Sequence, residues 1–333
     1  MKKKILCGLF ILGLFILTGC GSKDTDIVAT LTKKIEKLNS YHIQGTLEVT
    51  NNETTYQYDI DVAYQKDEKY RVSLKNKTNS HEQIILKNSE GVYVLTPSLN
   101  KSFKFQSEWP YNNSQSYLYQ TILEDIKNDD SKTVETKDNG YVIQTKVNYS
   151  NNKELTTQKI YLDKKANITK VEVLNKNGIV KIRMNYTNTD TNAKFDDDYF
   201  DLSSNMNVTG QNTETKKTIS EIEDVIYPLY LPENTYLESQ ETVATEDGER
   251  IILTFAGDSP FTLIEETASA NDEHIVIPVY GDLDFVNDTI GNITDQSASW
   301  ISDGIEYYAV SDSLDKDELL QMVNSVNVIT VGK

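Results

Sequence analysis

Cysteine and histidine are scarce in this sequence. Its 333 residues include two Cys and three His. Because Cys7 and Cys20 both lie among the first 20 residues, the rest of the chain can form no intramolecular disulfide and no cysteine-based zinc site. The histidines, His42, His81 and His274, are far apart in the sequence, and none has a Cys or a second His nearby at the spacing of metal ligands. We therefore expect no metal site, and we interpret the histidines as ordinary surface or strand residues.

Motifs of the common enzyme chemistries are also missing. The sequence has no nucleophile elbow, no HExxH motif and no Gly-rich loop of the kind that binds phosphate. Its densest acidic run, Asp196 to Asp198 with Asp201, lacks the ligand spacing and the distal Glu of a calcium-binding loop, so we interpret it as a solvated segment end. No nucleophile can be paired with a base. We expect a protein that is not an enzyme and needs no cofactor.

Positive charge is in short supply. The chain has 33 Lys and Arg against 51 Asp and Glu, which gives a formal charge of −18. Residues 1–19 hold three Lys and no acidic residue, so their removal would leave −21. A field of this sign repels the phosphate backbone, and no basic stripe offsets it, so we expect no nucleic-acid binding. The same acidity is also an ordinary route to solubility.

One apolar run stands near the N-terminus. It extends over 13 residues, from Ile5 to Leu17, and is shorter than the roughly 20 residues that a membrane-spanning helix needs. Three Lys precede it, so the run has the form of an export signal. It ends in Leu17-Thr18-Gly19-Cys20, which resembles a bacterial lipobox. The resemblance implies cleavage between Gly19 and Cys20 and a diacylglyceryl group on the Cys20 thiol.

Cys20 would then tether the protein to a membrane. Two acyl chains hold a protein stably at a bilayer, whereas one does so only marginally, at about 0.8 kcal/mol per buried methylene. We expect residues 1–19 to be a signal peptide and residues 20–26 a lipidated tether. The rest of the chain would lie at the outer face of the cytoplasmic membrane.

Residues 27–202 have the pattern of a curved β domain. A first helix is predicted from Ile27, Leu31, Ile35 and Leu38, which recur at helical spacing after the possible caps Asp24 and Thr25. Strands are predicted where apolar and polar residues alternate, at 43–49, 56–64, 70–74, 84–86, 92–95, 101–106, 141–149, 160–162, 171–173 and 180–186. About ten strands joined by tight turns predict one antiparallel meander, which must curl into a half-barrel or barrel with a concave face.

Residues 84–126 are the most structured stretch of this domain. After Trp109-Pro110 the apolar period changes, and Leu118, Ile122 and Ile126 predict a helix of about four turns from Asn113. This helix either packs on the sheet as ordinary core or forms a lid over an apolar cavity. The cavity and lid candidates are Phe103, Phe105, Trp109, Tyr111, Tyr117, Leu118 and Ile122.

A second, smaller domain is predicted after a linker. Residues 203–217 lose apolar periodicity and form the expected linker. Residues 218–333 contain predicted strands at 251–255, 261–265, 274–279 and 305–310, and Asp315 with Glu318 forms a capping-box-like start of a final helix. The expected fold class is mainly β (α+β): a half-barrel with a helical lid, followed by a small α+β domain.

The lipobox, the first helix and the segment GVYVLTPSLNKSFKFQSEWPYNNSQSYLYQTILEDI carry a resemblance. Residues 27–202 resemble the LolA/LolB-like fold, and more narrowly the YdcC-type sporulation and germination lipoproteins of spore-forming Gram-positive bacteria. The segment SASWISDGIEYYAVSDSL and the closing helix are similar to the C-terminal domain of RseB-type sigma-regulatory proteins. The resemblance implies an apolar concave face, which holds acyl chains in LolA-like carriers and takes part in sensing in RseB-type proteins. Germination lipoproteins instead bind and regulate a cell-wall amidase.

We therefore expect a membrane-tethered binding lipoprotein. Its concave face would hold an acyl chain or an envelope protein partner, for example a cell-wall amidase, in sporulation, germination or envelope maintenance. A carrier must diffuse between membranes, whereas Cys20 would fix this chain to one. The alternative is a sensor that regulates an anti-sigma or signalling protein through residues 218–333. A third class, a hydrolase of envelope material, is disfavoured because no catalytic pair is found.

Overall fold

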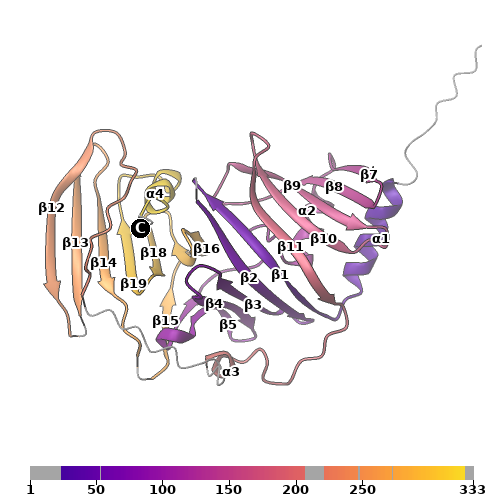
Figure 1. Ribbon diagram of the computed structural model, residues 1–333, viewed down its shortest axis with the longest axis horizontal. Helices are drawn as coiled ribbons and strands as arrows, with labels where there is room; N and C mark the ends of the chain where they lie inside the picture. The colour runs from indigo at the N-terminus through magenta and orange to yellow at the C-terminus, as the bar shows by residue number, and fades with distance from the viewer. Residues whose placement is uncertain (1–23, 53, 207–220, 247, 272, 327–333) are drawn as a thin grey trace, which may run out of the picture.

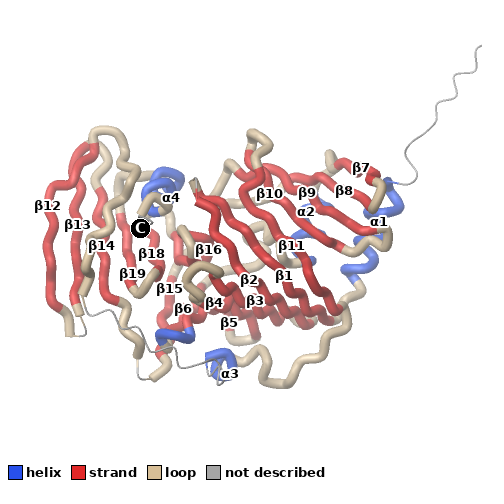
Figure 2. The backbone as a smooth tube through the Cα atoms, in the orientation of Figure 1, coloured by secondary structure: helices blue, strands red, loops and turns tan. Residues whose placement is uncertain are grey.

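The computed structural model describes residues 24–52, 54–206, 221–246, 248–271 and 273–326. The predicted signal peptide, the lipobox with Cys20 and the first part of the tether lie outside the described residues, as does most of the predicted linker. The described residues form two open sheets, and the mainly β fold class is confirmed. Figures 1 and 2 show the two sheets side by side, the first larger than the second. No helix in the described ranges is both long and apolar enough to span a membrane.

Twelve strands form the first sheet in the described part of the chain, in the order β15-β6-β5-β4-β3-β2-β1-β11-β10-β9-β8-β7. Their bounds are Ser40–Asn51 (β1), Thr54–Gln65 (β2), Lys69–Asn76 (β3), Glu82–Asn88 (β4), Gly91–Thr96 (β5), Lys101–Phe105 (β6), Thr133–Lys137 (β7), Gly140–Lys146 (β8), Leu155–Asp163 (β9), Ile168–Asn175 (β10), Val180–Asp190 (β11) and Ile275–Val279 (β15). A short 3-10 helix, Pro97–Leu99, joins β5 to β6. All ten strands predicted for residues 27–202 are present, and β7 is an additional one.

The prediction of one continuous meander is wrong. Strands β1 to β6 form one meander and β7 to β11 a second, and they meet at the centre of the sheet, where β1 pairs with β11. The chain crosses from β6 to the opposite edge through helix α2, Tyr119–Asn128, before β7 begins. Alternation shows that a segment is a strand, but the pairing of β1 with β11 joins segments more than a hundred residues apart, and no local pattern encodes it.

Helices α1, Asp24–Glu36, and α2 cover one face of the first sheet. Ile27, Leu31 and Ile35 of α1 are buried there, as the helical spacing predicts. Helix α2 begins at Tyr119, so the predicted start at Asn113 is wrong. Asn113 accepts hydrogen bonds from the backbone N–H and the hydroxyl of Ser150 instead, and this competing side-chain contact holds the preceding residues in a loop.

The opposite face of the first sheet carries a smaller apolar cluster. Helix α3, Leu202–Met206, lies against β5 and buries Met206 there together with Phe200. Residues 203–206, predicted as the start of the linker, are therefore helical and packed. The apolar side chain of Met206 decides this, because it gains burial that an extended linker could not supply.

The second sheet has seven strands within the described ranges, in the order β12-β13-β14-β19-β18-β17-β16. Their bounds are Thr235–Ala244 (β12), Glu249–Gly257 (β13), Phe261–Thr267 (β14), Asp282–Val286 (β16), Thr289–Ile293 (β17), Ser297–Ser302 (β18) and Ile305–Val310 (β19). Helix α4, Lys316–Val323, packs on it, and the predicted capping box is confirmed: Asp315 accepts a hydrogen bond from the Glu318 N–H and Glu318 accepts one from the Asp315 N–H. We call β12–β14, β16–β19 and α4 the second unit, and the first sheet with α1, α2 and α3 the first unit.

The strand predicted at residues 274–279 exists, but it joins the other sheet. Strand β15 pairs in parallel with β6, from Ile275 opposite Lys101 to Val279 opposite Phe105. The segment after β14 thus completes the edge of the first sheet before the chain returns to build β16. Parallel pairing needs a long connection, here more than 160 residues, so adjacent sequence gives no sign of it.

Candidate binding site

Side-chain hydrogen bonds join the two units. The amide of Gln83, on β4, is buried between them: its oxygen accepts from the Thr289 hydroxyl at 2.7 Å and from the Ile290 N–H at 2.6 Å, and its nitrogen donates to the Ile290 carbonyl at 3.1 Å. At the tip of the β1–β2 hairpin, Asn51 donates to the Asn287 carbonyl at 3.2 Å. A buried amide with three partners fixes one orientation of the second unit on the first.

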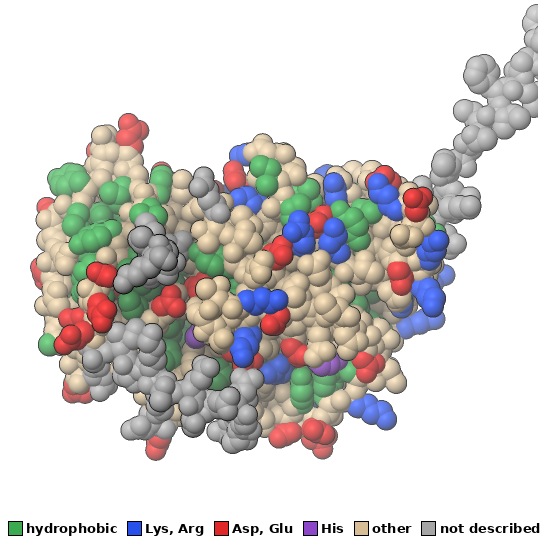
Figure 3. All heavy atoms as spheres, in the orientation of Figure 1, with side chains coloured by type: hydrophobic (Ala, Val, Ile, Leu, Met, Phe, Trp, Pro, Cys, Tyr) green, Lys and Arg blue, Asp and Glu red, His purple; other side chains and the backbone are tan. Residues whose placement is uncertain are grey.

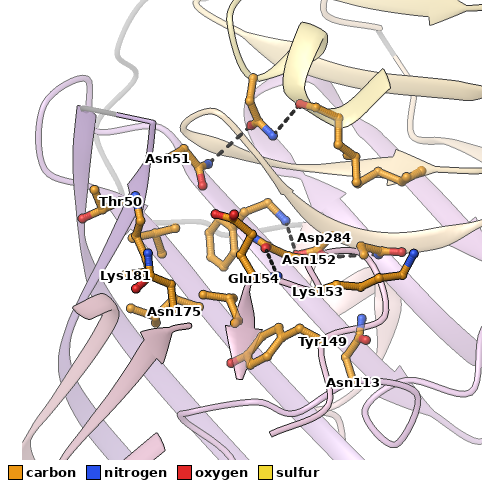
Figure 4. Close-up of a pocket in the computed structure, with 18 of the residues that line it drawn as sticks. Thr50, Asn51, Asn113, Tyr149, Asn152, Lys153, Glu154, Asn175, Lys181 and Asp284 are labelled. Atoms are coloured by element: carbon orange, nitrogen blue, oxygen red, sulfur yellow. Dashed lines mark hydrogen bonds between the residues drawn. The ribbon is translucent and has the colours of Figure 1, made fainter. Parts of the chain in front are cut away.

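A cavity of about 630 Å³ lies between the units, at one end of the α1/α2-covered face of the first sheet. Figure 4 shows Thr50 and Lys181 of the first sheet on the left and Asp284 of the second unit to the right, beside Asn152. Its apolar lining comes from both units: Leu47, Val49, Leu155 and Ile182 from the first, and Leu283, Phe285, Ile290, Ile293 and Leu320 from the second. Its polar lining is rich in carboxamides: Asn51, Asn52, Asn113, Gln115, Asn151, Asn152, Asn175, Gln321 and Asn324.

The charged groups at the rim are largely paired with one another. Lys176 and Glu154 form an ion pair at 3.0 Å, and Lys153 lies 3.3 Å from Asp317 of α4. Lys181 donates to the Asn52 carbonyl at 3.3 Å. These contacts offset part of the charge at the rim, and the apolar lining residues Leu47, Val49 and Leu283 are buried.

A polar cluster of four residues, Tyr117, Tyr149, Asn151 and Asp284, lies on the wall of the cavity. Asp284 on β16 accepts hydrogen bonds from the Asn151 side-chain amide at 3.0 Å and from the Phe285 N–H at 2.8 Å. Burial raises the pKa of the Asp284 carboxyl above its ordinary value. Burial, with Asp284 nearby, also raises the pKa of the Tyr117 phenol, so this hydroxyl keeps its proton.

The predicted cavity and lid residues lie mostly in a filled core. Trp109, Leu118 and Ile122 are fully buried, and Trp109 packs edge-to-face on Tyr70. Phe103 and Phe105 border a space of only about 20 Å³, which holds at most one or two waters. Tyr111 is 41% exposed, and its hydroxyl lies 3.0 Å from that of Tyr70. Of the seven candidates, Tyr117 is the one that lines the large cavity.

The cavity residues that the sequence did not reveal come from two sources. Leu283, Asp284 and Phe285 belong to a strand that was not predicted, in the other unit. Most of the carboxamides belong to loops and hairpin tips at one end of the first sheet, such as Asn51-Asn52 and Asn151-Asn152, and Asn is an ordinary turn residue. Gln321 and Asn324 come from α4 and its C-terminal cap instead. The only hint of the cavity in the sequence was the repeated occurrence of Asn at turns. Because Asn is common in turns, this repetition did not point to a binding site.

The three histidines lie in separate surroundings. His42 lies 2.8 Å from the Asp61 carboxylate, and His274 lies 2.9 Å from the Ser102 hydroxyl. Burial lowers the pKa of His81, whose Nε2 has no hydrogen-bond partner among the described residues. Within the same ranges, no three His, Cys, Asp or Glu side chains are arranged to hold a metal ion.

The fold and site define a mainly β protein in which two open sheets, joined by buried hydrogen bonds, enclose a cavity. The chain belongs to the YdcC-like family: the family model described as "Sporulation protein YdcC-like" matches residues 1–200. The sporulation protein YdcC of Bacillus subtilis (strain 168) is 36% identical over 324 residues, which are 97% of this chain and 95% of the relative. The predicted resemblance to this family is confirmed.

Solved structures were also matched, at low sequence identity and low TM-score. The Pseudomonas aeruginosa MucA/MucB complex matches with 13% identity and a TM-score of 0.34, covering 90% of this chain and 97% of the matched one. The CwlD amidase from Clostridioides difficile in complex with the GerS lipoprotein matches with 19% identity and a TM-score of 0.30, over 53% and 97%. A LolA superfamily protein from Nitrosomonas europaea matches with 10% identity and a TM-score of 0.32, over 54% and 98%.

Proposed function

We propose that this YdcC-family chain is a binding lipoprotein, anchored through Cys20 at the outer face of the cytoplasmic membrane, whose cavity holds a ligand with an acyl chain. The role would lie in sporulation, germination or envelope maintenance, in keeping with the family. The cavity carries the proposal, because its volume of about 630 Å³ falls in the range of small-molecule sites.

The lining of the cavity supports an apolar ligand with a polar end. Leu47, Val49 and Ile182 of the first sheet line it together with Leu283 and Phe285 of the second unit. Each methylene group buried on such a surface contributes about 0.8 kcal/mol, so a chain of ten carbons gains on the order of 8 kcal/mol before the costs of binding. The polar rim would leave the other end of the ligand hydrated.

Native mass spectrometry of residues 20–333, exported with Cys20→Ser and purified gently from its own envelope, tests the proposal. We expect a bound mass that matches a lipid or an acylated molecule. Ile182→Glu places a charge in the cavity and should abolish binding of this lipid or acylated molecule. Ile179→Glu, on the same hairpin but 56% exposed, is the matched control and should retain it. Protein that carries a second polypeptide and no lipid would instead identify a protein partner, and the acyl proposal would be wrong.

Membrane anchoring is tested separately. The wild-type chain should fractionate with the membrane and Cys20→Ser should be released, because the variant cannot carry the diacylglyceryl group. Equal membrane association of the two chains would contradict the anchor.

A sensor is the second candidate, and one observation favours it. Both units line the cavity, so a ligand would contact both and could change the free energy of their contact. Disruption of that contact should then alter a transcriptional response in the cell, and an unchanged transcriptome would count against the sensor.

A further inference from the structure

The Asp284 carboxylate in the cavity forms no ion pair with a described residue. No described Lys, Arg or His lies within ion-pair distance of it. The nearby Lys316 is instead 3.9 Å from Asp282 and 3.7 Å from Asp295. Asp284 is partly buried, and its removal from water carries a free-energy cost for the ionised form and raises its pKa, which the charge of Lys316 offsets only in part. A cationic group in the cavity would remove this cost.

Asn151 adds an unsatisfied acceptor beside the carboxylate. Its side chain is 4% exposed, and its amide nitrogen donates to Asp284. An ionised carboxylate can only accept, so this contact fixes the amide with its oxygen pointing elsewhere. That oxygen is buried and has no hydrogen-bond partner among the described residues. Asp284 and the Asn151 amide oxygen are thus two acceptors on the same cavity wall, and the Asn151 oxygen has no donor among the described residues.

Aromatic rings complete the surroundings. Tyr117, Tyr149 and Phe285 line the same cavity, and Tyr149 lies at its wall in Figure 4. Burial raises the pKa of both phenols, so they stay neutral and add no second negative charge. The faces of such rings attract a cation, and more strongly when water is excluded.

The charge of the second unit acts in the same direction. Between residues 221 and 326 the chain has two basic residues, Arg250 and Lys316. In Figure 3, Asp and Glu side chains are visible over the second unit, whereas Lys and Arg side chains gather over the first sheet. This unit supplies Asp284, and its negative field favours entry of a cation over entry of an anion.

We propose that the ligand carries a primary ammonium group, which donates hydrogen bonds to the Asp284 carboxylate and the Asn151 amide oxygen. The Tyr117 and Tyr149 rings flank it, and the apolar part of the ligand lies on the leucine and isoleucine lining. The inference rests on the proposed function, because it assigns the polar end of the same ligand. An aminolipid headgroup and an acylated peptide with a free amino group share this chemistry.

Three probes with the same ten-carbon chain, decylamine, decanol and decanoate, test the inference by titration calorimetry at constant ionic strength and below their aggregation concentrations. We expect the wild-type protein to bind decylamine at least about tenfold more tightly than decanol, and decanoate most weakly. Asp284→Asn keeps the shape of the side chain and should bind decylamine no better than decanol. Glu238→Gln removes one charge from the exposed strand β12 and should keep the wild-type preference.

The outcomes separate the two proposals. Equal binding of the three probes would overturn the ammonium assignment and leave the acyl-binding function standing. Binding of none would overturn the function, and the assignment with it. Retained decanol binding by Asp284→Asn shows that its cavity is folded, so a lost preference for the amine supports the assignment. Lysophosphatidylethanolamine and a palmitoylated peptide with a free amino group, competed against decylamine, distinguish the two sources. If neither compound competes with decylamine, the proposal that the ammonium group belongs to a lipid or an acylated peptide is overturned.

Discussion

Glu265 is a fully buried carboxyl group in the core of the second unit. It lies on β14, on the face where Leu263 is also buried, and the Ile226 N–H donates to its two oxygens at 3.0 and 3.2 Å. Burial raises its pKa from 4.5 to about 7, which the hydrogen bonds from Ile226 only partly offset. Glu265→Gln keeps the size of the side chain and removes the titrating group.

The sign of the effect follows from the raised pKa. The folded protein binds the proton more tightly than the unfolded chain does, so the stabilising contribution is complete below pH 4.5 and is lost as the pH rises through 7. With these two pKa values, the loss between pH 5 and pH 8 is about 2.5 kcal/mol in the free energy of unfolding. The wild-type protein should lose this amount relative to Glu265→Gln over that interval.

Urea denaturation of residues 21–333 at pH 5, 6, 7 and 8, monitored by circular dichroism and tryptophan fluorescence, measures the difference. Glu266→Gln is the matched control: it is the next residue, faces the other side of the strand and pairs with Arg250 at 2.6 Å. The control should keep the wild-type pH dependence. If Glu265→Gln also keeps it within about 0.5 kcal/mol, the carboxyl does not titrate as its burial requires, and the reasoning is refuted.

Two further predictions concern the packing of the first sheet and the joint between the units. Trp109→Ala should lower the free energy of unfolding by about 3–5 kcal/mol, because Trp109 is fully buried, and a loss under about 1 kcal/mol in urea denaturation would contradict a filled core. Gln83→Ala leaves the Thr289 hydroxyl and the Ile290 backbone without partners and should cost about 2–4 kcal/mol, seen as earlier unfolding of the second unit. Gln57→Ala, on an exposed part of β2, is its control, and equal effects of the two would contradict the buried joint.

The alternation of apolar and polar residues, together with the residues that cap helices, made most individual strands and helices predictable. The alternating patterns predicted the ends of β1, β2 and β3 to within a few residues. One face of each strand is buried, so apolar residues recur at every second position. The capping box of α4 was readable for a similar reason: its two hydrogen bonds join residues three apart. The start of α2 was not predictable in this way, because Asn113 in the loop before it accepts a hydrogen bond from Ser150, which is distant in the sequence.

The candidate site was predictable only in part. The seven residues predicted to line a cavity or form its lid lie mostly in the core, and of these seven Tyr117 lines the cavity. Whether an apolar side chain meets a neighbour or an empty space depends on every element packed around it. Trp109 packs against Tyr70 on β3, and the residues next to Trp109 in the sequence do not reveal this contact.

The sequence by itself determined most of the strands, the capped final helix and membership of the family, since these depend on residues close together in the chain or on likeness along it. Only the tertiary structure decided that β1 and β11 meet, that β15 crosses to the first sheet, and that Asn151 and Asp284 share a cavity. The members of each pair are separated by more than a hundred residues. Their meeting is set by the packing of whole sheets, which no local pattern of residues records.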